Sequence, residues 1–506
     1  MEQKIKRFWE ENKKLLALCL VAVFVWGLAA HAYAFLNFQL SHDSLDGLYA
    51  HSGENDHKIE LGRVFVPVYR FLFHGSFTAP WLTGFQALVW IALAVFLTAM
   101  VLDVRSKGGV ALLAGLMTVN LTVTALAATF LHDLDVNMFG LMLSCLAAFL
   151  WKKKVPGWPV LGGLAVGFAI GLYQSYVSVT IVLVMMSLMM DLLDGEKPGK
   201  AIARGAGAAA MVLVGAVVYF AGVKLIPALA KITLAERPNS VTQLGNLQLD
   251  RVPALIAQAY ANWLDFFFNP HTAWLSTGVM RIVNLALLAL AAGLLVWLMA
   301  RKTVSALAKV LVLLLAALLP LMMNVCYLLT SGGVHDLMKY AFMLVFVLVV
   351  LLAGRVSFRP VRWLCTALVC VLLWGGVVTA NTVYLKKTSV WNATYAGMTN
   401  VVYDMLYYGY EPSETPVFIS GRIPFADMPG FEQFADVMGL VHNNAVTQDE
   451  KSIKAYFRYV LGDDIQFCSS EEQEEIMATE DFEWMSCWPE EGYITIINDV
   501  MVVRLN

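Results

Sequence analysis

The feature that most constrains this chain is a succession of apolar segments that fills residues 15–382. Most of them approach the ~20 residues that an α-helix needs to cross the hydrocarbon core of a bilayer. The segments lie at about 15–36, 81–101, 109–130, 136–151, 158–192, 203–225, 277–299, 304–323, 338–353 and 362–382. With 59% hydrophobic and 14% charged residues, the chain is too apolar for a soluble protein of several domains. The sequence therefore predicts an α-helical polytopic membrane protein.

The segment at 158–192 differs from the others in length. It is too long for one crossing and short for two, since about 34 residues at ~1.5 Å each give only ~50 Å of helix. We expect two short, tilted helices hinged near Gly171. With this segment counted as two, the prediction is about 11 transmembrane helices.

The distribution of Lys and Arg predicts the orientation of the chain. Basic residues collect in the N-terminus and in alternate loops, whereas the loops at 37–80, 131–135, 226–275 and 325–337 are poor in them. Because short cytoplasmic loops carry the excess of basic residues, the N-terminus is predicted to be cytoplasmic. The four basic-poor loops, and everything after Asn381, are then extracytoplasmic.

Residues 383–506 form a region of a different kind, which is polar and acidic. It holds an aromatic, helix-like stretch, VVYDMLYYGY, and a β-like stretch, TPVFIS. Its end, YITIINDVMVVRL, predicts two strands joined at Asn498-Asp499. We expect a transmembrane domain at 1–382 and a small extracytoplasmic α/β domain at 383–506. Cys468 and Cys487 lie in this second domain, in the oxidising compartment, and the sequence leaves open whether they pair.

Titratable residues gather at three places where a predicted span meets the extracytoplasmic side. The groups are His42, Asp43, Asp46, Glu60 and Arg63 in the first loop, then His132, Asp133 and Asp135, then His335, Asp336 and Lys339. Acids, imidazoles and a few cations at one face of the bilayer suit a site that deprotonates a hydroxyl and holds a phosphate. The alternative is that they are solvated loop charges without a chemical role.

Several polar residues have two readings that the sequence does not separate. Tyr173 and Gln174 fall inside a span, where a polar amide is costly unless it is hydrogen-bonded. They either bind a sugar or lipid phosphate or bond a neighbouring helix. Asp133 and Asp135 are suited to acceptor hydroxyls or to a divalent ion. Fewer than three clear ligands are present, so we expect no metal.

The loop at 226–275 contains the apolar and aromatic stretch LDRVPALIAQAYANWLDFFFNP. Such a stretch is typical of an amphipathic helix at the membrane interface, where it would border a lipid entrance. A cap over the helix bundle is the alternative, and both roles are compatible. The sequence shows no Gly-rich phosphate loop, HExxH or Gly-x-Ser-x-Gly element, which argues against nucleotide-driven pumping, zinc hydrolysis and serine esterase chemistry.

The order of three motifs resembles a known family. An acid-rich first outer loop ends in Gly62-Arg63, an acidic entry to the fourth span runs from Asp133 to Asn137, and GLYQSY follows at 171–176. In this order the chain is similar to the polytopic GT-C-type glucosyltransferases that modify surface polysaccharides, which include phage serotype-converting enzymes. The family commonly has two adjacent acids in the first loop. Here His42 precedes Asp43 and the second acid is Asp46, so the division of labour between the two Asp stays open.

The resemblance implies a multi-pass enzyme of the bacterial cytoplasmic membrane, with residues 1–382 as its GT-C-like catalytic domain. Such enzymes move a sugar, here expected to be glucose, from a polyprenyl-phosphate donor to a cell-surface glycan acceptor at the outer leaflet, without a cofactor and without nucleic acid. An inverting transfer needs a carboxylate as general base and a cationic clamp on the departing phosphate. We assign the base to Asp43, with Asp46 second. Arg63 and Lys339 are the candidates for the clamp.

The remaining candidate site residues are expected to bind substrate, namely Glu60, His132, Asp133, Asp135, Tyr173, Gln174 and His335. Two rival functions stay open. A lipid-linked oligosaccharide flippase would place ionisable residues along a path within its spans and would tend to show internal repeats. A polysaccharide polymerase or ligase also uses outer-leaflet lipid substrates, but polymerases tend to use arginine-rich outer loops, and these loops are acid-rich.

Overall fold

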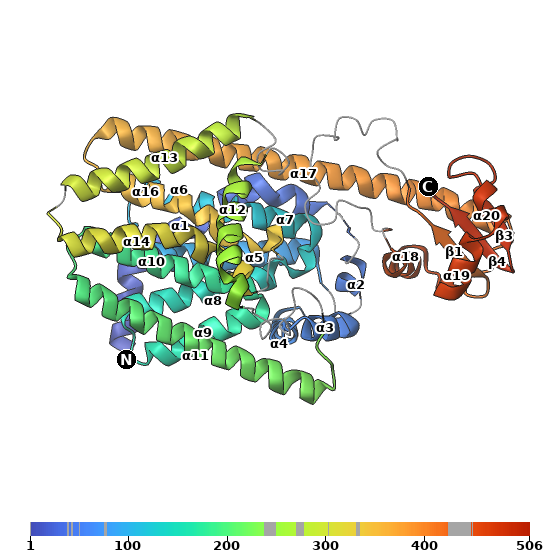
Figure 1. Cartoon of the computed structure of the whole chain (residues 1–506), viewed down its shortest axis with the longest axis horizontal. Helices are drawn as coiled ribbons and strands as arrows, with labels where there is room; N and C mark the ends of the chain where they lie inside the picture. The colour runs from blue at the N-terminus through green and yellow to red at the C-terminus, as the bar shows by residue number, and fades with distance from the viewer. Residues whose placement is uncertain are drawn as a thin grey trace. The chain divides into compact units, whose positions relative to one another are not determined.

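The computed structural model divides the chain into two compact units (Figure 1). The first comprises residues 1–36, 52–127 and 131–381, and the second comprises residues 37–51, 128–130 and 382–506. The structure describes residues 2–37, 40–41, 44–49, 51–74, 78–236, 249–269, 278–301, 303–329, 334–423, 447 and 449–506.

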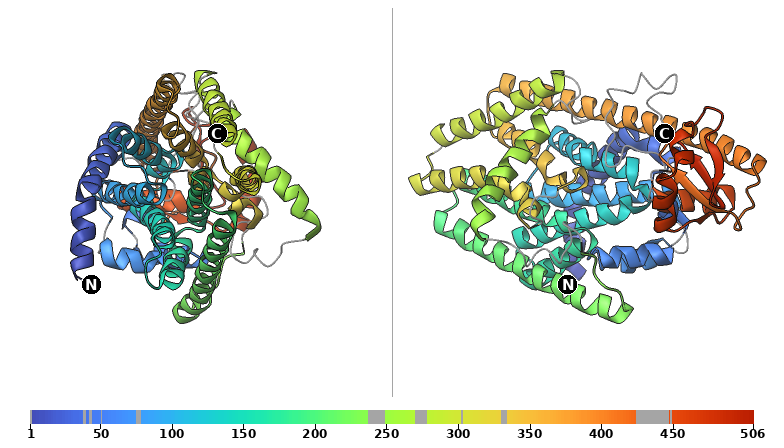
Figure 2. Two further views of the ribbon diagram at one scale, coloured as in Figure 1. Left: turned by 90° about the vertical axis from the view of Figure 1, so that its left-hand side faces the viewer. Right: turned by 45° about the vertical axis from the view of Figure 1, so that its right-hand side comes forward.

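The first unit is a bundle of helices, several of which appear nearly end-on in the left view of Figure 2. Its long helices coincide with the apolar segments of the sequence, and proline at the start of α5, α9 and α11 marks where three of them begin. The α-helices are α1 (Glu2–Leu36), α3 (His51–Glu60), α4 (Val66–Phe73), α5 (Pro80–Leu102), α6 (Lys107–Thr118), α7 (Leu121–Thr129), α8 (Leu134–Lys153), α9 (Trp158–Leu172), α10 (Val177–Leu193), α11 (Pro198–Ala230), α12 (Val252–Phe268), α13 (Gly278–Arg301), α14 (Ala306–Met323), α15 (Val325–Leu329), α16 (Val345–Gly354) and α17 (Arg359–Tyr407). The short 3-10 helices are η1 (Leu131–Asp133), η2 (Gln174–Tyr176), η4 (Leu249–Arg251), η6 (Asp336–Met338) and η7 (Tyr340–Leu344).

Within the described residues, eight helices are long and apolar enough to cross a membrane. A ninth crossing is reached if α6 and α7, which meet at a bend of 42°, form one span. The apolar segments at 158–172 and 340–354 are shorter. The predicted count of eleven requires that the bent pair and both short segments cross as well, so it stays a prediction, as does the orientation.

The apolar segment at 158–192 is broken, as the sequence predicts. Helix α9 ends at Leu172, and Tyr173 is extended, with φ −158° and ψ 122°. The break therefore lies two residues after the expected hinge at Gly171. Gly171 has a different role, because a Cβ there would lie 2.2 Å from the ring of Phe65. Its missing side chain lets the first loop approach the break, and the Phe65 N–H donates to the Gly171 carbonyl at 3.0 Å.

Two further helices bear on the sequence analysis. Helix α12 lies in the long loop where an amphipathic helix is expected, and Figure 1 shows it crossing the direction of α14 steeply; its interfacial position stays a prediction. Helix α17 continues to Tyr407, so the last apolar segment and the aromatic stretch after 400 belong to one helix. The residues between them contain no proline, so no residue of that kind interrupts the helix there.

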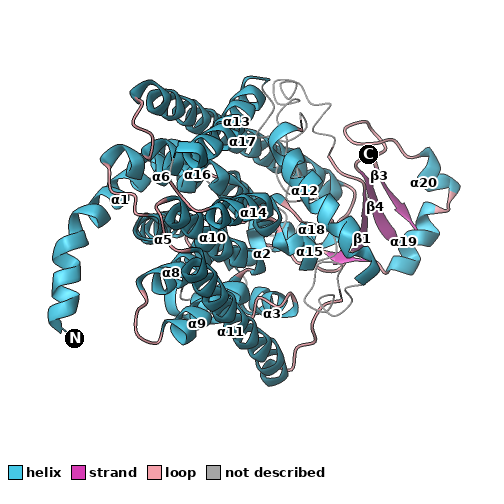
Figure 3. Ribbon diagram, turned by 60° about the vertical axis from the view of Figure 1, so that its left-hand side comes forward, coloured by secondary structure: helices cyan, strands magenta, loops and turns pink. Residues whose placement is uncertain are grey.

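The second unit contains a four-stranded sheet with the order β2-β1-β4-β3 (Figure 3). The strands are β1 (Pro416–Ser420), β2 (Gln466–Phe467), β3 (Ile494–Ile497) and β4 (Val500–Arg504). In addition to the end of α17, this unit contains the helices α2 (Ser44–Tyr49), α18 (Glu450–Tyr456), α19 (Ser470–Met477) and α20 (Glu480–Trp484), and a π-helical turn at Phe457–Leu461. Strand β1 is parallel to β2 and β4, which makes the fold α/β.

The predicted terminal hairpin is confirmed. Strands β3 and β4 pair antiparallel, with Ile497 opposite Val500. The two residues between them, Asn498 and Asp499, have φ of 52° and 63°, as a two-residue hairpin turn of type I′ requires. Cys468 and Cys487 of this unit are both free thiols.

Candidate functional site

The first loop forms a short helix, α3, that presents an ion pair to the bundle. Glu54 and Lys58 lie four residues apart, so their side chains share one face of the helix. The Lys58 ammonium contacts the Glu54 carboxylate, and both side chains are buried. Burial removes the hydration of both side chains, and a buried ion pair needs further polar or charged partners to offset this desolvation cost.

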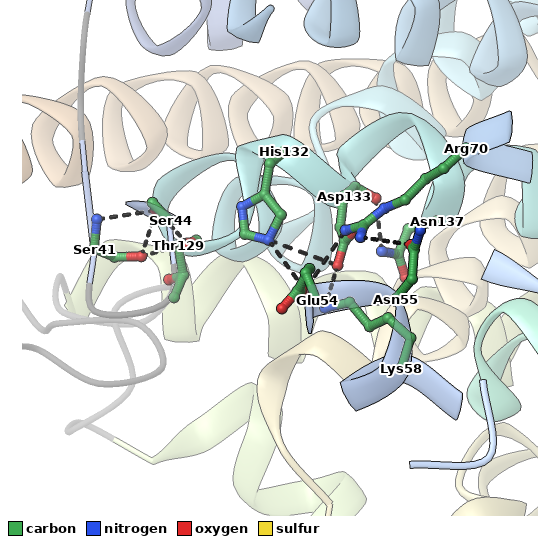
Figure 4. Close-up of polar contacts among 10 residues, drawn as sticks. All are labelled: Ser41, Ser44, Glu54, Asn55, Lys58, Arg70, Thr129, His132, Asp133 and Asn137. Atoms are coloured by element: carbon green, nitrogen blue, oxygen red, sulfur yellow. Dashed lines mark hydrogen bonds and ion pairs between the residues drawn. The ribbon is translucent and has the colours of Figure 1, made fainter. Parts of the chain in front are cut away.

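Asp133 supplies those partners from a distant part of the chain. It is the last residue of η1 and directly precedes α8, and both of its carboxylate oxygens are ion-paired: Lys58 Nζ is 2.6 Å from Oδ2 and Arg70 Nη2 is 2.6 Å from Oδ1. Figure 4 shows the two cations reaching it from different helices. The first turn of a helix favours a negative charge, so α8 also stabilises the carboxylate. We call Glu54, Lys58, Arg70 and Asp133 the charge cluster.

Arg70 holds the charge cluster together. Its Nη2 is 3.5 Å from Glu54 Oε1 as well, and its Nη1 donates to Asn55 Oδ1 at 3.1 Å. Asn137 Nδ2 donates to the Asp133 carbonyl at 2.8 Å. With two carboxylates and two cations, the charge cluster carries no net charge, and its side chains are only 2 to 6% exposed.

The loop residues of the charge cluster stay ionised. Burial alone would raise the pKa of Glu54, but the Lys58 ammonium opposes it and the pKa lies below its ordinary value. Burial likewise acts to lower the pKa of Arg70, and the charges of Asp133 and Glu54 outweigh it, so the pKa is raised. A carboxylate of this kind is a weak base at neutral pH.

His132 lies beside the charge cluster. Its Nε2 is 3.8 Å from both Glu54 Oε1 and Asp133 Oδ2, and the three side chains form a group of possible metal ligands. Lys58 contacts both carboxylates of that group, so a divalent ion would have to displace the ammonium. The chemistry of the group therefore fits an internal salt bridge better than a metal centre, and the expectation of no metal stays a prediction.

Asp135, two residues after Asp133 in the first turn of α8, forms a second buried contact group. Its Oδ2 accepts a hydrogen bond from the Tyr69 hydroxyl at 2.7 Å and lies 2.7 Å from His74 Nε2. Trp90 Nε1 donates to the Tyr69 hydroxyl at 2.9 Å. Burial and the charge of Asp135 raise the pKa of Tyr69, which keeps its proton. These bonds fasten α4 to α8 beside a cluster that includes Val66 and Leu172.

The first loop and the broken span meet at a third place, which we call the motif junction. Gln174 Nε2 donates to the Leu61 carbonyl and the Tyr219 hydroxyl donates to the Gly62 carbonyl, both at 3.2 Å. The turn needs φ +74° at Gly62, which glycine adopts without strain. The Arg63 guanidinium stacks over the Tyr173 ring, 4.6 Å from its centroid. Across the described ranges, Arg63 has no carboxylate partner.

The third predicted group forms its own ion pair. Lys339 Nζ is 2.9 Å from Asp336 Oδ1, and the Asp336 carbonyl accepts from Thr122 Oγ1 at 2.6 Å. Lys339 also lies over the Phe266 ring, 5.9 Å from its centroid. His335 is exposed. No ion pair joins Asp336 or Lys339 to the charge cluster in the part of the chain that the structure describes.

Comparison with known proteins identifies the family. Residues 32–352 match the family described as Glucosyl transferase GtrII. The chain belongs to the GtrII glucosyltransferase family. Searches of curated proteins and of solved structures gave no match. Membership makes the chain a membrane glycosyltransferase and confirms the resemblance drawn from its motifs.

The segment that matches GtrII contains every predicted site residue. The structure brings some of these residues into contact with one another and leaves others separate. His132 and Asp133 meet the first loop, Tyr173 and Gln174 meet Gly62-Arg63, and the third group stands apart. Glu60 contacts His57 at 3.3 Å near the surface. Asp43, with His42, lies outside the described residues; Asp46 belongs to α2, but its side chain lies outside them too.

Sequence reasoning missed five members of this part of the GtrII segment, which are Glu54, Lys58, Tyr69, Arg70 and His74. One signal was available, since Glu54 and Lys58 have the four-residue spacing of a helical ion pair. Arg70 was hidden in the apolar stretch VPVYRFLF. A single cation in such a stretch is itself a reason to look for a buried acid.

Proposed function

We propose that the chain transfers glucose from a polyprenyl-phosphate donor to a cell-surface glycan acceptor at the extracytoplasmic face of the membrane, with inversion at the anomeric carbon. Family membership supports the glucosyl transfer. The observation that carries the rest is Arg63. It is a cation that the described protein does not neutralise, at the junction of the first loop and the broken span. A phosphate at headgroup depth would complete its charge.

The general base is Asp43, with Asp46 as second choice. Three other acids near the first loop, Asp133, Glu54 and Asp135, are already engaged. Both oxygens of Asp133 are ion-paired at 2.6 Å, so an acceptor hydroxyl would have to displace a cation. Glu54 has a lowered pKa, and Asp135 is fully buried against Tyr69 and His74. This elimination favours the acids that precede α3.

The reaction needs one proton transfer and one exchange of bonds. The Asp43 carboxylate takes the proton of the acceptor hydroxyl as that oxygen attacks the anomeric carbon. The bond from the anomeric carbon to the phosphate oxygen breaks, and the electron pair leaves with polyprenyl phosphate. Arg63 stabilises the negative charge that develops on the leaving phosphate. The charge cluster acts at one remove, because it fixes α3, which directly precedes the turn at Gly62-Arg63, against α8.

The test is turnover by the purified full chain with polyprenyl-phosphate glucose and a glycan acceptor, measured as release of polyprenyl phosphate. Asp43→Asn keeps the size of the side chain but removes the base, so we expect turnover to fall by about 10²- to 10⁴-fold with donor binding unchanged. Asp56→Asn is the matched control, since Asp56 is an exposed acid of the same loop.

Each alternative outcome has a defined meaning. If Asp46→Asn alone abolishes turnover, the base is Asp46. If neither change matters, the first loop is not the catalytic centre. Movement of intact lipid-linked sugar across a vesicle membrane, without cleavage of the sugar–phosphate bond, would favour the flippase over the transferase. A reporter fused after Asn381 that is active only in the cytoplasm would overturn the proposed orientation.

A further inference from the structure

A hollow of about 670 Å³ lies between three helices far from the site described above. Helices α6, α16 and α17 border it, and Figures 1 and 3 show them side by side. The space beside two glycines of these helices is open, because a Cβ at Gly108 or Gly354 would meet nothing within 4 Å. The hollow lies at loops that the basic residues predict to be cytoplasmic, so it belongs to the opposite side from the proposed catalytic site.

The charge of this hollow is unbalanced. Arg359 and Arg362, one helical turn apart at the start of α17, both line it, and no carboxylate does. Neither arginine has an ion pair among the residues that the structure describes. Two guanidinium groups offer forked donors that match the oxygens of a phosphate.

A second hollow of the same volume provides the contrast. It also measures about 670 Å³ and is lined by five cations, but three acids line it too. Asp191 Oδ2 is 2.7 Å from Lys152 Nζ and 2.6 Å from Arg204 Nη1, and Glu196 contacts Arg204 at 2.8 Å. In that hollow Lys152, Lys200 and Arg204 are held in ion pairs with the acids, whereas neither arginine of the first hollow has an ion pair among the described residues.

The surroundings of the arginines are apolar. Trp363 lines the same hollow and is 72% exposed, and Phe358, which directly precedes α17, is 60% exposed. Exposed tryptophan beside arginine at the end of a candidate span is typical of the membrane–water interface. Basic pockets between transmembrane helices on the cytoplasmic side are known to hold anionic lipid head groups.

We propose that the hollow formed by α6, α16 and the start of α17 binds the phosphate of an anionic phospholipid of the cytoplasmic leaflet. Arg359 and Arg362 contact the phosphate, Trp363 packs at the level of the glycerol, and the acyl chains follow the apolar faces of the helices. The inference shares the predicted orientation with the proposed function but does not rest on the glucosyl transfer, so loss of turnover and loss of lipid preference can be told apart.

The experiment measures lipid retention by the purified full chain in a neutral detergent. The chain is exposed to an equal mixture of phosphatidylglycerol and phosphatidylcholine with the same acyl chains, and retained lipid is counted by native mass spectrometry. We expect a preference for phosphatidylglycerol that falls about tenfold or more in R359Q/R362Q, since each basic residue near the surface contributes to attraction for anionic lipid. The matched control is K154Q/K197Q, which removes two cations from the lining of the second hollow and is expected to keep the preference.

Three other outcomes would contradict the proposal, and a second set of variants keeps the test valid if the double variant does not fold. An unchanged preference in R359Q/R362Q, or an equal loss in K154Q/K197Q, overturns the assignment to this hollow. Loss of the preference in millimolar inorganic phosphate would mean that free phosphate is the ligand and would overturn the lipid. If R359Q/R362Q does not fold, R362Q alone decides, with R359K/R362K expected to retain the preference.

Discussion

Helix α8 has an ion-pair network at each end, and the two networks differ in how deeply their side chains are buried. At its start lies the charge cluster, whose side chains are 2 to 6% exposed. At its end, Lys152 in the last turn joins Asp191, Arg204 and Glu196, whose side chains are 11 to 24% exposed. Both follow the helix dipole, with acid at the start and base at the end. Burial is what separates them.

This difference indicates which network has a role beyond stability. A partly solvated network costs little to form and contributes little, so the one at Lys152 needs no explanation beyond joining successive spans. Burying two carboxylates and two cations carries a desolvation cost that ion pairing barely repays. A protein keeps such a cluster where it gains a fixed geometry, and here the fixed element is α3, which belongs to the same loop as the proposed phosphate clamp Arg63.

The largest effect on stability is expected from Asp133→Asn. The change leaves Lys58 and Arg70 buried with Glu54 as their only acid within the charge cluster. Removing one partner from a buried ion pair typically costs about 3 to 5 kcal/mol. The free energy of unfolding, measured by titration with SDS in mixed micelles, should fall by that amount. In Lys58→Met/Asp133→Leu a neutral pair replaces the charged one, and most of the loss should be recovered; a double variant as unstable as the single one would contradict the comparison.

The next effect is on function and concerns a cation that no network neutralises. Arg63→Ala should lower kcat/KM by about 10- to 100-fold, the value of a charge-assisted bond of roughly 1.5 to 3 kcal/mol. Donor binding should weaken as well, because a phosphate clamp acts before and during the reaction. Lys339→Ala serves as comparison, since Lys339 already pairs with Asp336, and should lose less. Equal losses would show that neutralisation by the protein does not decide which cation binds phosphate.

A smaller effect is expected at the other end of α8. Asp191→Asn removes the acid that Lys152 and Arg204 share, but these side chains reach water. We expect the free energy of unfolding to fall by less than about 1 kcal/mol, in the same SDS titration. A loss as large as that of Asp133→Asn would remove the distinction between the two networks.

The smallest effect should come from His335→Ala. The side chain is exposed, and surface changes of this kind usually alter stability by no more than about 0.5 kcal/mol. Turnover and donor binding should equal those of the unchanged chain. A clear loss of turnover would restore the third predicted group to the site.

The parts of the fold that sequence predicted are those with local signals. Apolar segments near ~20 residues long mark membrane helices, and Asn498-Asp499 between alternating apolar residues marks a hairpin. The break of the fifth segment was visible because its length fits neither one crossing nor two. The count of spans was less certain, since α9 and α16 are shorter than a full crossing and length alone does not say whether they traverse the bilayer.

The candidate site was predictable only in part, because its contacts join distant residues. The sequence singles out His132 and Asp133 as titratable groups at a span boundary. No local sequence pattern predicts that the two carboxylate oxygens of Asp133 pair with Lys58 and Arg70. The motif junction shows the same limit. Gly62-Arg63 and GLYQSY were each noted in the sequence, and the structure adds that Tyr173 and Gln174 of the second hold the turn of the first.

The separation between Arg70 and Asp133 in the sequence also affects biogenesis. The two residues are 63 positions apart, and a chain is made from its N-terminus. Lys58 and Arg70 of the first loop are therefore synthesised before Asp133, their acidic partner. Both cations remain hydrated until α8, which follows Asp133, has been inserted. The loop reaches its final conformation late, so a chain released before α8 is complete should expose α3 to proteases while its earlier spans are already in the membrane.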